Sequence, residues 1–175
     1  MARIRKAVAY RKLKRPYTRK SKFRELSYVR ASPVSKVVRY EMGELKKKFP
    51  VSLELISETN LQIRHNAIES SRLTCNRLLE KQLGKNGFHL QLRMFPHHIL
   101  RENPLASGAG ADRMSTGMAR SFGKPIGIAA QITKGKILFV LSVEKKDLAT
   151  AKKALLRAQY KLPCSCKIVV HEKKQ

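Results

Sequence analysis

The chain has two adjacent histidines, His97 and His98. The imidazole of a histidine can act as a general base or ligate a metal ion. A general base needs a reacting partner, and no serine or cysteine of this chain lies in a recognisable nucleophile motif. Neighbouring side chains on an extended segment point to opposite faces, so one metal ion would not take both imidazoles. We therefore expect the histidines to hydrogen-bond a bound partner or to pack at the base of the loop that follows them.

Two glycine patterns have the composition of ligand-binding loops. The first, SGAGAD at 107–112, lacks the Lys-Ser or Lys-Thr ending of a P-loop and does not open a helix as a Rossmann GxGxxG does. The second, GKNG at 84–87, has the GxxG spelling of a KH domain, but a strand follows it where that domain has a helix. Gly84 is better explained as the end of a helix. The glycines of the first segment suit close backbone approach to another surface.

Three cysteines, Cys75, Cys164 and Cys166, fit a reducing compartment, because an odd number in a long chain is not a disulfide framework. The Cys-Ser-Cys spacing is too short for an ordinary C-x₂-C zinc site. We predict that these side chains pack as small apolar groups, and we expect no metal and no cofactor.

The charge balance favours a polyanion as the partner. Lys plus Arg number 38 against 12 Asp plus Glu in 175 residues, which gives a net charge of +26 and a pI of about 10.6. Such a surface binds phosphate backbones by displacing condensed counterions, and RNA is the polyanion favoured here. There is no apolar run of membrane-spanning length, and the basic N-terminus has no signal-peptide core. We predict a cytoplasmic protein with no membrane partner.

Residues 1–24 hold eleven Lys or Arg and no acid, and aromatic residues such as Tyr17 lie among them. A segment of this composition does not fold alone. Cations interleaved with aromatics suit both phosphate contact and base stacking, so we interpret it as an RNA-bound arm rather than a free solubilising tail.

Residues 101–124 form a long run broken by five Pro or Gly, which predicts neither helix nor strand. Loops of this length are uncommon in compact domains unless they are functional or disordered. Met114 and Met118 fit either one helical turn with a buried stripe or a soft apolar surface for a partner or exposed bases. The run also carries four cations and two acids.

The remaining pattern predicts an α+β sandwich of two helices packed on a mostly antiparallel sheet. Expected strands are 37–41, 51–57, 88–95, 125–133, 136–143 and 164–170, and expected helices are 64–83 and 147–160. Residues 61–63 fit either an extension of the second strand or the start of the first helix. Lys134-Gly135 predicts a hairpin between the fourth and fifth strands. The domain plan is a basic arm at 1–33, one domain at 34–171 and a polar tail at 172–175.

Several ordered stretches resemble one family over nearly the whole chain. They are KRPYT at 14–18, IRHNA at 63–67, FPHHILREN at 95–103, GAGADR at 108–113, GM at 117–118 and FGKP at 122–125. The chain is similar to the archaeal and eukaryotic form of a large-ribosomal-subunit protein family, universal protein sixteen, formerly ten-e. The resemblance implies an α/β-hammerhead-like fold and a structural, non-enzymatic role in translation, with neighbouring ribosomal proteins as partners.

The resemblance also implies that the chain binds large-subunit rRNA and helps position tRNA in the A and P sites near the peptidyl-transferase centre. Expected rRNA-binding residues are Arg3, Arg5, Lys6, Arg11, Lys12, Lys14, Arg15, Tyr17, Arg19, Lys20, Lys22, Arg24, Arg64, His65, His97 and His98. Expected tRNA-proximal loop residues are Arg101, Gly108, Gly110, Asp112, Arg113, Met114, Gly117, Met118, Arg120 and Lys124.

Two other functions fit the same residues. One is a free RNA-binding or RNA-chaperone protein with no fixed particle. The other is an RNA-processing enzyme that uses His97 or His98.

Overall fold

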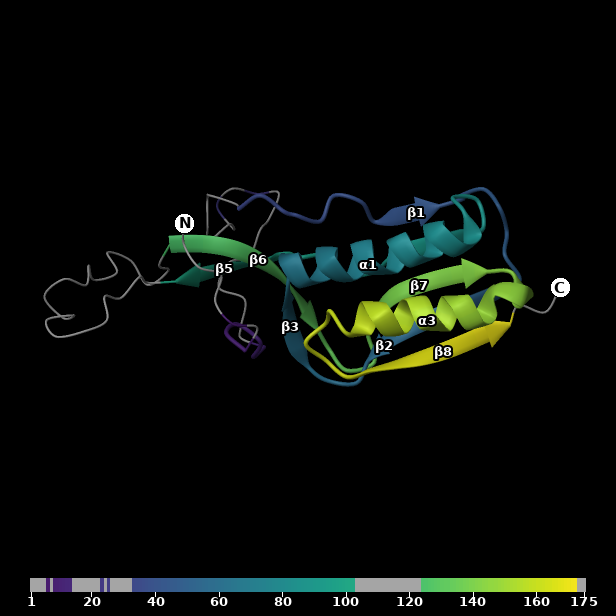
Figure 1. The fold of residues 1–175 in the computed structure, drawn as a ribbon. Helices are drawn as coiled ribbons and strands as arrows, with labels where there is room; N and C mark the ends of the chain where they lie inside the picture. Colours follow the sequence, from purple (N-terminus) through teal and green to yellow (C-terminus); the bar gives the residue numbers. More distant parts are fainter. Residues whose placement is uncertain are drawn as a thin grey trace, which may run out of the picture.

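In the part of the chain that the structure describes, two antiparallel sheets and two long helices make up the fold (Figure 1). The computed structural model describes residues 6, 8–13, 23, 25, 33–102 and 124–172. All strand pairs in this part of the chain are antiparallel. The α+β class expected from the sequence is confirmed, whereas the hammerhead-like arrangement stays a prediction.

The larger sheet has five strands in the order β1-β4-β7-β2-β8. Their bounds are Glu41–Gly43 for β1, Val51–Ser57 for β2, Phe88–Leu92 for β4, Ile137–Val143 for β7 and Cys166–Glu172 for β8. Alternate residues of β2 are buried, because successive side chains of a strand point to opposite faces of the sheet. Leu53 lies between Leu141 and Val170 on the neighbouring strands, at the centre of the core.

The short edge strand β1 approaches β4 very closely at Gly43. Its φ of 89° is in the left-handed region, and a Cβ placed there would lie 2.1 Å from the carbonyl oxygen of Phe88. Glycine is required at this position for both reasons.

Two helices, α1 (His65–Leu83) and α3 (Leu148–Gln159), lie side by side against one face of the larger sheet (Figure 1). A short 3₁₀ turn, η2 (Lys145–Asp147), leads into α3. Where the helices meet, the buried Ser71 hydroxyl donates a hydrogen bond to the Ala158 carbonyl at 2.9 Å. Gly84 ends α1, with φ 71° and its N–H bonded to the Glu80 carbonyl, as predicted.

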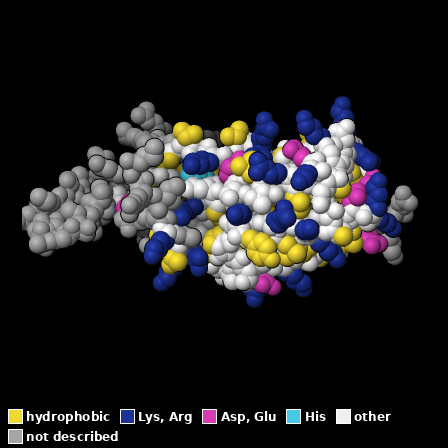
Figure 2. All heavy atoms as spheres, viewed as in Figure 1, with side chains coloured by type: hydrophobic (Ala, Val, Ile, Leu, Met, Phe, Trp, Pro, Cys, Tyr) yellow, Lys and Arg dark blue, Asp and Glu magenta, His cyan; other side chains and the backbone are white. Residues whose placement is uncertain are grey.

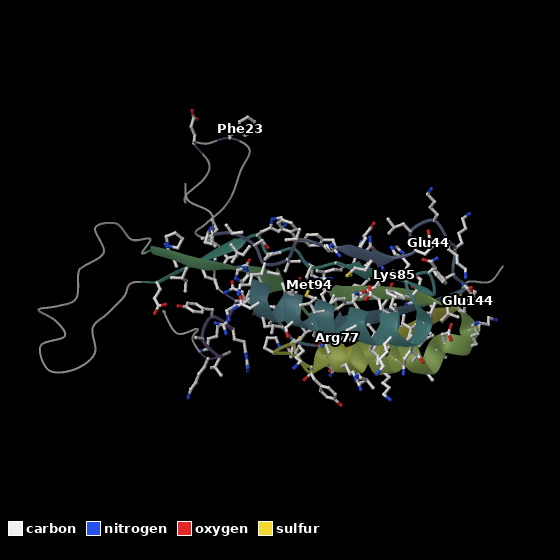
Figure 3. The ribbon with its side chains drawn as sticks, turned by 45° about the horizontal axis from the view of Figure 1, so that its top comes forward. Phe23, Glu44, Arg77, Lys85, Met94 and Glu144 are labelled. Carbon is white, nitrogen blue, oxygen red and sulfur yellow. The ribbon has the colours of Figure 1, made fainter. Side chains whose placement is uncertain are left out.

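The smaller sheet has three strands in the order β3-β6-β5, with bounds Leu61–Arg64, Lys124–Ile132 and His98–Glu102. Strands β5 and β6 extend beyond the start of α1, at the end of the molecule away from the C-terminus (Figure 1). Figure 3 places the labelled residues Glu44, Lys85 and Glu144 at the opposite end from this pair.

The predicted hairpin between 125–133 and 136–143 is wrong. The turn at 134–135 forms, but β6 and β7 belong to different sheets. The physical reason is that β7 has β2 on one edge and β4 on the other, so neither edge is free for β6. Strand β6 pairs instead with β3 and β5.

Several other boundaries differ from the prediction, and the predicted strand 88–95 ends at Leu92. The first strand is 41–43 rather than 37–41, because the pairing with β4 covers Glu41 to Gly43. Residues 61–63 belong to β3, a strand of the second sheet, which resolves the two alternatives in favour of a separate strand. The run 101–124 is not wholly irregular, because Arg101 and Glu102 end β5 and Lys124 begins β6. The last strand extends to Glu172, inside the predicted tail.

Candidate nucleic-acid interface

The described part of the basic arm is bound to the smaller sheet. The backbone carbonyls of Tyr10 and Arg11 accept hydrogen bonds from Gln62 on β3, one from the side-chain amide and one from the backbone N–H, each at 2.9 Å. The Tyr10 hydroxyl donates to the Glu102 carboxylate on β5 at 2.6 Å. Tyr10 has a φ of 65°, which is uncommon for a residue with a side chain. These contacts leave Lys6, Arg11 and Lys12 exposed to solvent.

The arm therefore lies at the stem of the loop that the sequence singles out. Glu102 pairs with Lys124, and Arg101 pairs with Pro125 after an irregularity in the register beyond Leu100. The chain thus leaves and re-enters the sheet at adjacent positions. Because Tyr10 bonds Glu102, two segments far apart in sequence meet at one edge of the molecule.

His65 and Arg64 lie where β3 becomes α1, next to the arm. The His65 Nδ1 accepts a hydrogen bond from the Lys36 backbone N–H at 3.2 Å. Burial lowers the pKa of His65, and the charges of Lys36 and Arg64 lower it further, so the imidazole is neutral at pH 7. A neutral ring that accepts through Nδ1 carries its proton on Nε2, which is a donor.

The two adjacent histidines have different surroundings. His98 is half-buried in β5, and burial together with the charge of Arg101 lowers its pKa. His97 is exposed, and its ring lies 4.4 Å from that of Phe95. Phe95 in turn stacks on Tyr40, with ring centroids 5.4 Å apart and planes 20° from parallel. The sequence prediction missed Phe95 and Tyr40, although an aromatic residue two positions before His97 was a readable signal.

Exposed Lys and Arg side chains come from many segments of the described chain. Figure 2 shows Lys and Arg side chains spread over the visible face, with few acidic side chains between them. One acid that is paired, Glu144, bonds Lys47 at 2.9 Å, and another, Glu54, bonds His171 at 3.3 Å. The surface offers many cations to a polyanion over a wide area.

Many of the predicted RNA-contacting residues lie outside the described residues. In the arm these are Arg3, Arg5, Lys14, Arg15, Tyr17, Arg19, Lys20, Lys22 and Arg24. In the loop they are Gly108, Gly110, Asp112, Arg113, Met114, Gly117, Met118 and Arg120. Their roles stay predictions.

Cys75 is fully buried, and burial raises its pKa to about 12, as expected of a core thiol. Cys164 and Cys166 are half-buried against the core, with their sulfurs 3.4 Å apart. Within the described ranges no three His, Cys, Asp or Glu residues gather in a way that could hold a metal ion. No helix in these ranges is long and apolar enough to cross a membrane.

The fold and the surface define a small, strongly basic α+β protein whose exposed cations suit a polyanionic partner. Comparison with known proteins identifies the family. The sequence profile of the family described as "Ribosomal protein L16p/L10e" matches residues 13–169, and the chain belongs to this family.

Relatives named "Large ribosomal subunit protein uL16" align over nearly their full length. The protein of Methanococcus maripaludis strain S2 is 46% identical over 173 residues, covering 98% of this chain and 96% of its own. That of Methanoculleus marisnigri is 44% identical and covers 93% of each chain. That of Archaeoglobus fulgidus is 42% identical and covers 93% of this chain and 90% of its own. The chain is thus a uL16-family structural protein of the large ribosomal subunit, a family in which RNA binding is typical.

Proposed function

We propose that this protein binds large-subunit rRNA and helps position tRNA in the A and P sites near the peptidyl-transferase centre. It acts in the cytoplasm as a non-catalytic part of the particle, beside neighbouring ribosomal proteins. The observation that carries the proposal is the convergence of arm and loop stem, with Tyr10 bonded to Glu102 at 2.6 Å.

This convergence supports a division of roles. The arm would supply affinity, because each Lys or Arg that neutralises a phosphate releases a condensed counterion. The loop 103–123 would reach the tRNA. The paired strands β5 and β6, on which it begins and ends, would hold it in position. Arg101 stands at the boundary of the two regions, on β5.

Co-sedimentation with large subunits tests the rRNA part of the proposal. Wild-type protein should sediment with salt-washed subunits in moderate salt, and a variant lacking residues 1–9 should dissociate at lower salt. Wild-type protein that stays off the subunits would favour the free RNA-binding alternative.

Deleting residues 108–120 tests the tRNA part. Because the described strands and helices lie outside this span, circular dichroism should show an unchanged fold. Subunits that carry the deletion should sediment normally and bind A-site and P-site tRNA more weakly. Normal tRNA binding would show that the loop does not have this role.

A separate assay of RNA cleavage tests the enzymatic alternative. It compares the wild-type protein with a variant in which both His97 and His98 are changed to Ala.

A further inference from the structure

The connection between β4 and β5 presents alternating side chains to the core and to solvent. Met94, labelled in Figure 3, and Pro96 are buried, whereas Arg93, Phe95 and His97 are exposed. The chain turns at Pro96, where the His97 N–H donates to the Phe95 carbonyl at 3.0 Å, and this turn brings the exposed phenyl ring and imidazole together. The backbone is held on the inner side, where the Arg93 N–H donates to the Leu138 carbonyl at 2.9 Å.

The Phe95 ring is held in place although it is 51% exposed. Tyr40 stacks on it with centroids 5.4 Å apart, and the His97 ring lies 4.4 Å from it. The backbone of Tyr40 is held beside β4, because its carbonyl accepts the Leu92 N–H at 2.7 Å. A single exposed apolar side chain needs no explanation. Contacts with two neighbouring rings restrict the Phe95 side chain, so less conformational entropy is lost when a partner binds to it.

The charges around this aromatic group select the partner. Arg93 is exposed two positions before Phe95, and Arg39 is exposed next to Tyr40 in the sequence. A nucleotide offers a flat apolar base to the ring and a phosphate to the guanidinium groups. Paired bases do not expose their faces, so the complementary ligand is an unpaired nucleotide.

We propose that Phe95, supported by Tyr40 and His97, is a stacking site for an unpaired nucleobase of RNA. The inference rests on the proposed function in that it needs the protein to bind RNA, but it does not need the arm or the loop. It assigns a role to a connection that neither of those segments contains. Arg93 and Arg39 contact the phosphates that flank the stacked base.

The absence of tryptophan from the sequence allows a direct measurement. Phe95→Trp introduces a single indole at the site, and Tyr160→Trp introduces one at a matched control position, where the native ring is 80% exposed beside Lys161. The probe is an adenine oligoribonucleotide about 12 nucleotides long, compared with the same strand in a duplex. We expect saturating single strand to quench the fluorescence of F95W strongly, the duplex to quench it weakly, and neither to quench Y160W to a comparable extent.

Affinity provides the second readout. Loss of one base–aromatic stack should weaken single-strand binding by about 5- to 150-fold. Phe95→Ala should show this loss with an unchanged dependence on salt, since no phosphate contact is removed. Phe95→Leu keeps apolar volume without a ring, so it should lose affinity similarly even if the alanine variant is poorly folded by circular dichroism. The variant that lacks residues 1–9 should instead show a weaker dependence of its RNA affinity on salt concentration.

The outcomes separate the inference from the function on which it rests. Wild-type protein that binds neither strand nor large-subunit rRNA overturns both. RNA binding with equal affinity in wild type and F95L, or equal quenching of F95W by strand and duplex, overturns the stacking site and leaves the proposed function standing. Selective quenching together with loss of affinity in F95L supports it.

Discussion

Replacing Glu69 by Ala should destabilise the protein strongly, because Glu69 neutralises a charge inside the fold. Arg72 on α1 is 7% exposed, and its Nε donates to a Glu69 carboxylate oxygen at 2.9 Å while a second N–H bonds the other oxygen. The hydrogen bond to Glu69 is the largest cause of a raised pKa at Arg72. Arg72 also donates from Nη1 to the Met42 sulfur, 3.1 Å away, which is a weak acceptor, and Glu80 acts on it through its charge.

The expected cost follows from leaving that guanidinium unpaired. Breaking a buried ion pair from one side costs about 3 kcal/mol or more. For a chain of this length that loss lowers the melting temperature by roughly 6–12 °C. Arg72→Met removes the buried charge itself, and the Glu69 side chain that remains is 19% exposed and retains access to water. This variant should therefore cost about 1 kcal/mol or less.

Urea denaturation followed by circular dichroism measures both values, with the slope compared to confirm a common unfolding transition. The double variant, Glu69→Ala with Arg72→Met, should be more stable than Glu69→Ala alone. Equal destabilisation by E69A and R72M, or a double variant no better than E69A, would refute the reasoning that an uncompensated charge is the source of the loss.

Three further outcomes follow from described geometry. Gly43→Ala should cost far more stability than Gly135→Ala in thermal melts: both have positive φ, about 1 kcal/mol of strain, but a Cβ meets nothing within 4 Å at Gly135. Because the pKa of His65 is lowered in the folded protein, the unfolded chain binds a proton at this residue at a higher pH than the folded protein does. Stability should therefore fall as the pH drops below about 6.5. His65→Gln should make stability depend less on pH, as measured by denaturation at several pH values. Iodoacetamide should alkylate Cys164, whose pKa is lowered by its bond to Cys166, well before buried Cys75, and mass spectrometry of the native protein would show the reverse order if this were wrong.

The elements with strong local patterns were predictable from the sequence. Residues 51–55 alternate apolar and polar side chains, and the strand has the predicted bounds 51–57. The first helix was predicted correctly except for one residue at its start. Its signal was the apolar residues Ile68, Cys75 and Leu79, which repeat at helical spacing. Such signals come from residues that are close together in the chain, so they can be read without any knowledge of tertiary contacts.

The errors came from pairing partners that are distant in sequence. The 134–135 turn predicted a hairpin, but the edges of β7 belong to β2 and β4, which no local pattern reveals. Strand β5 was missed because its partner residues lie across the loop in β6. The buried Arg72 was also missed, since an arginine on a helix normally indicates an exposed face.

At the candidate interface, the sequence predicted the adjacent histidines and the cations but not the aromatic stack. Tyr40 and Phe95 are 55 positions apart, and the Leu92 to Tyr40 backbone hydrogen bond is what brings their segments together. The bond from Tyr10 to Glu102 joins the arm and the loop stem across an even longer separation. Local composition identified both regions, and tertiary structure shows that they meet.

The long strand β6 has a mechanical consequence. Its nine residues span about 30 Å at the usual rise of a strand. Its inner half, residues 129–132, pairs with β3, and its outer half, residues 124–129, pairs with β5. The turn that follows β6 is fixed to the larger sheet, where Ser57 exchanges backbone hydrogen bonds with Gly135 and Lys136 at 2.8 and 3.0 Å. Strand β6 therefore connects the stem of the loop at one end with the larger sheet at the other, so a substitution at Ser57 would act on the loop only through the whole length of this strand.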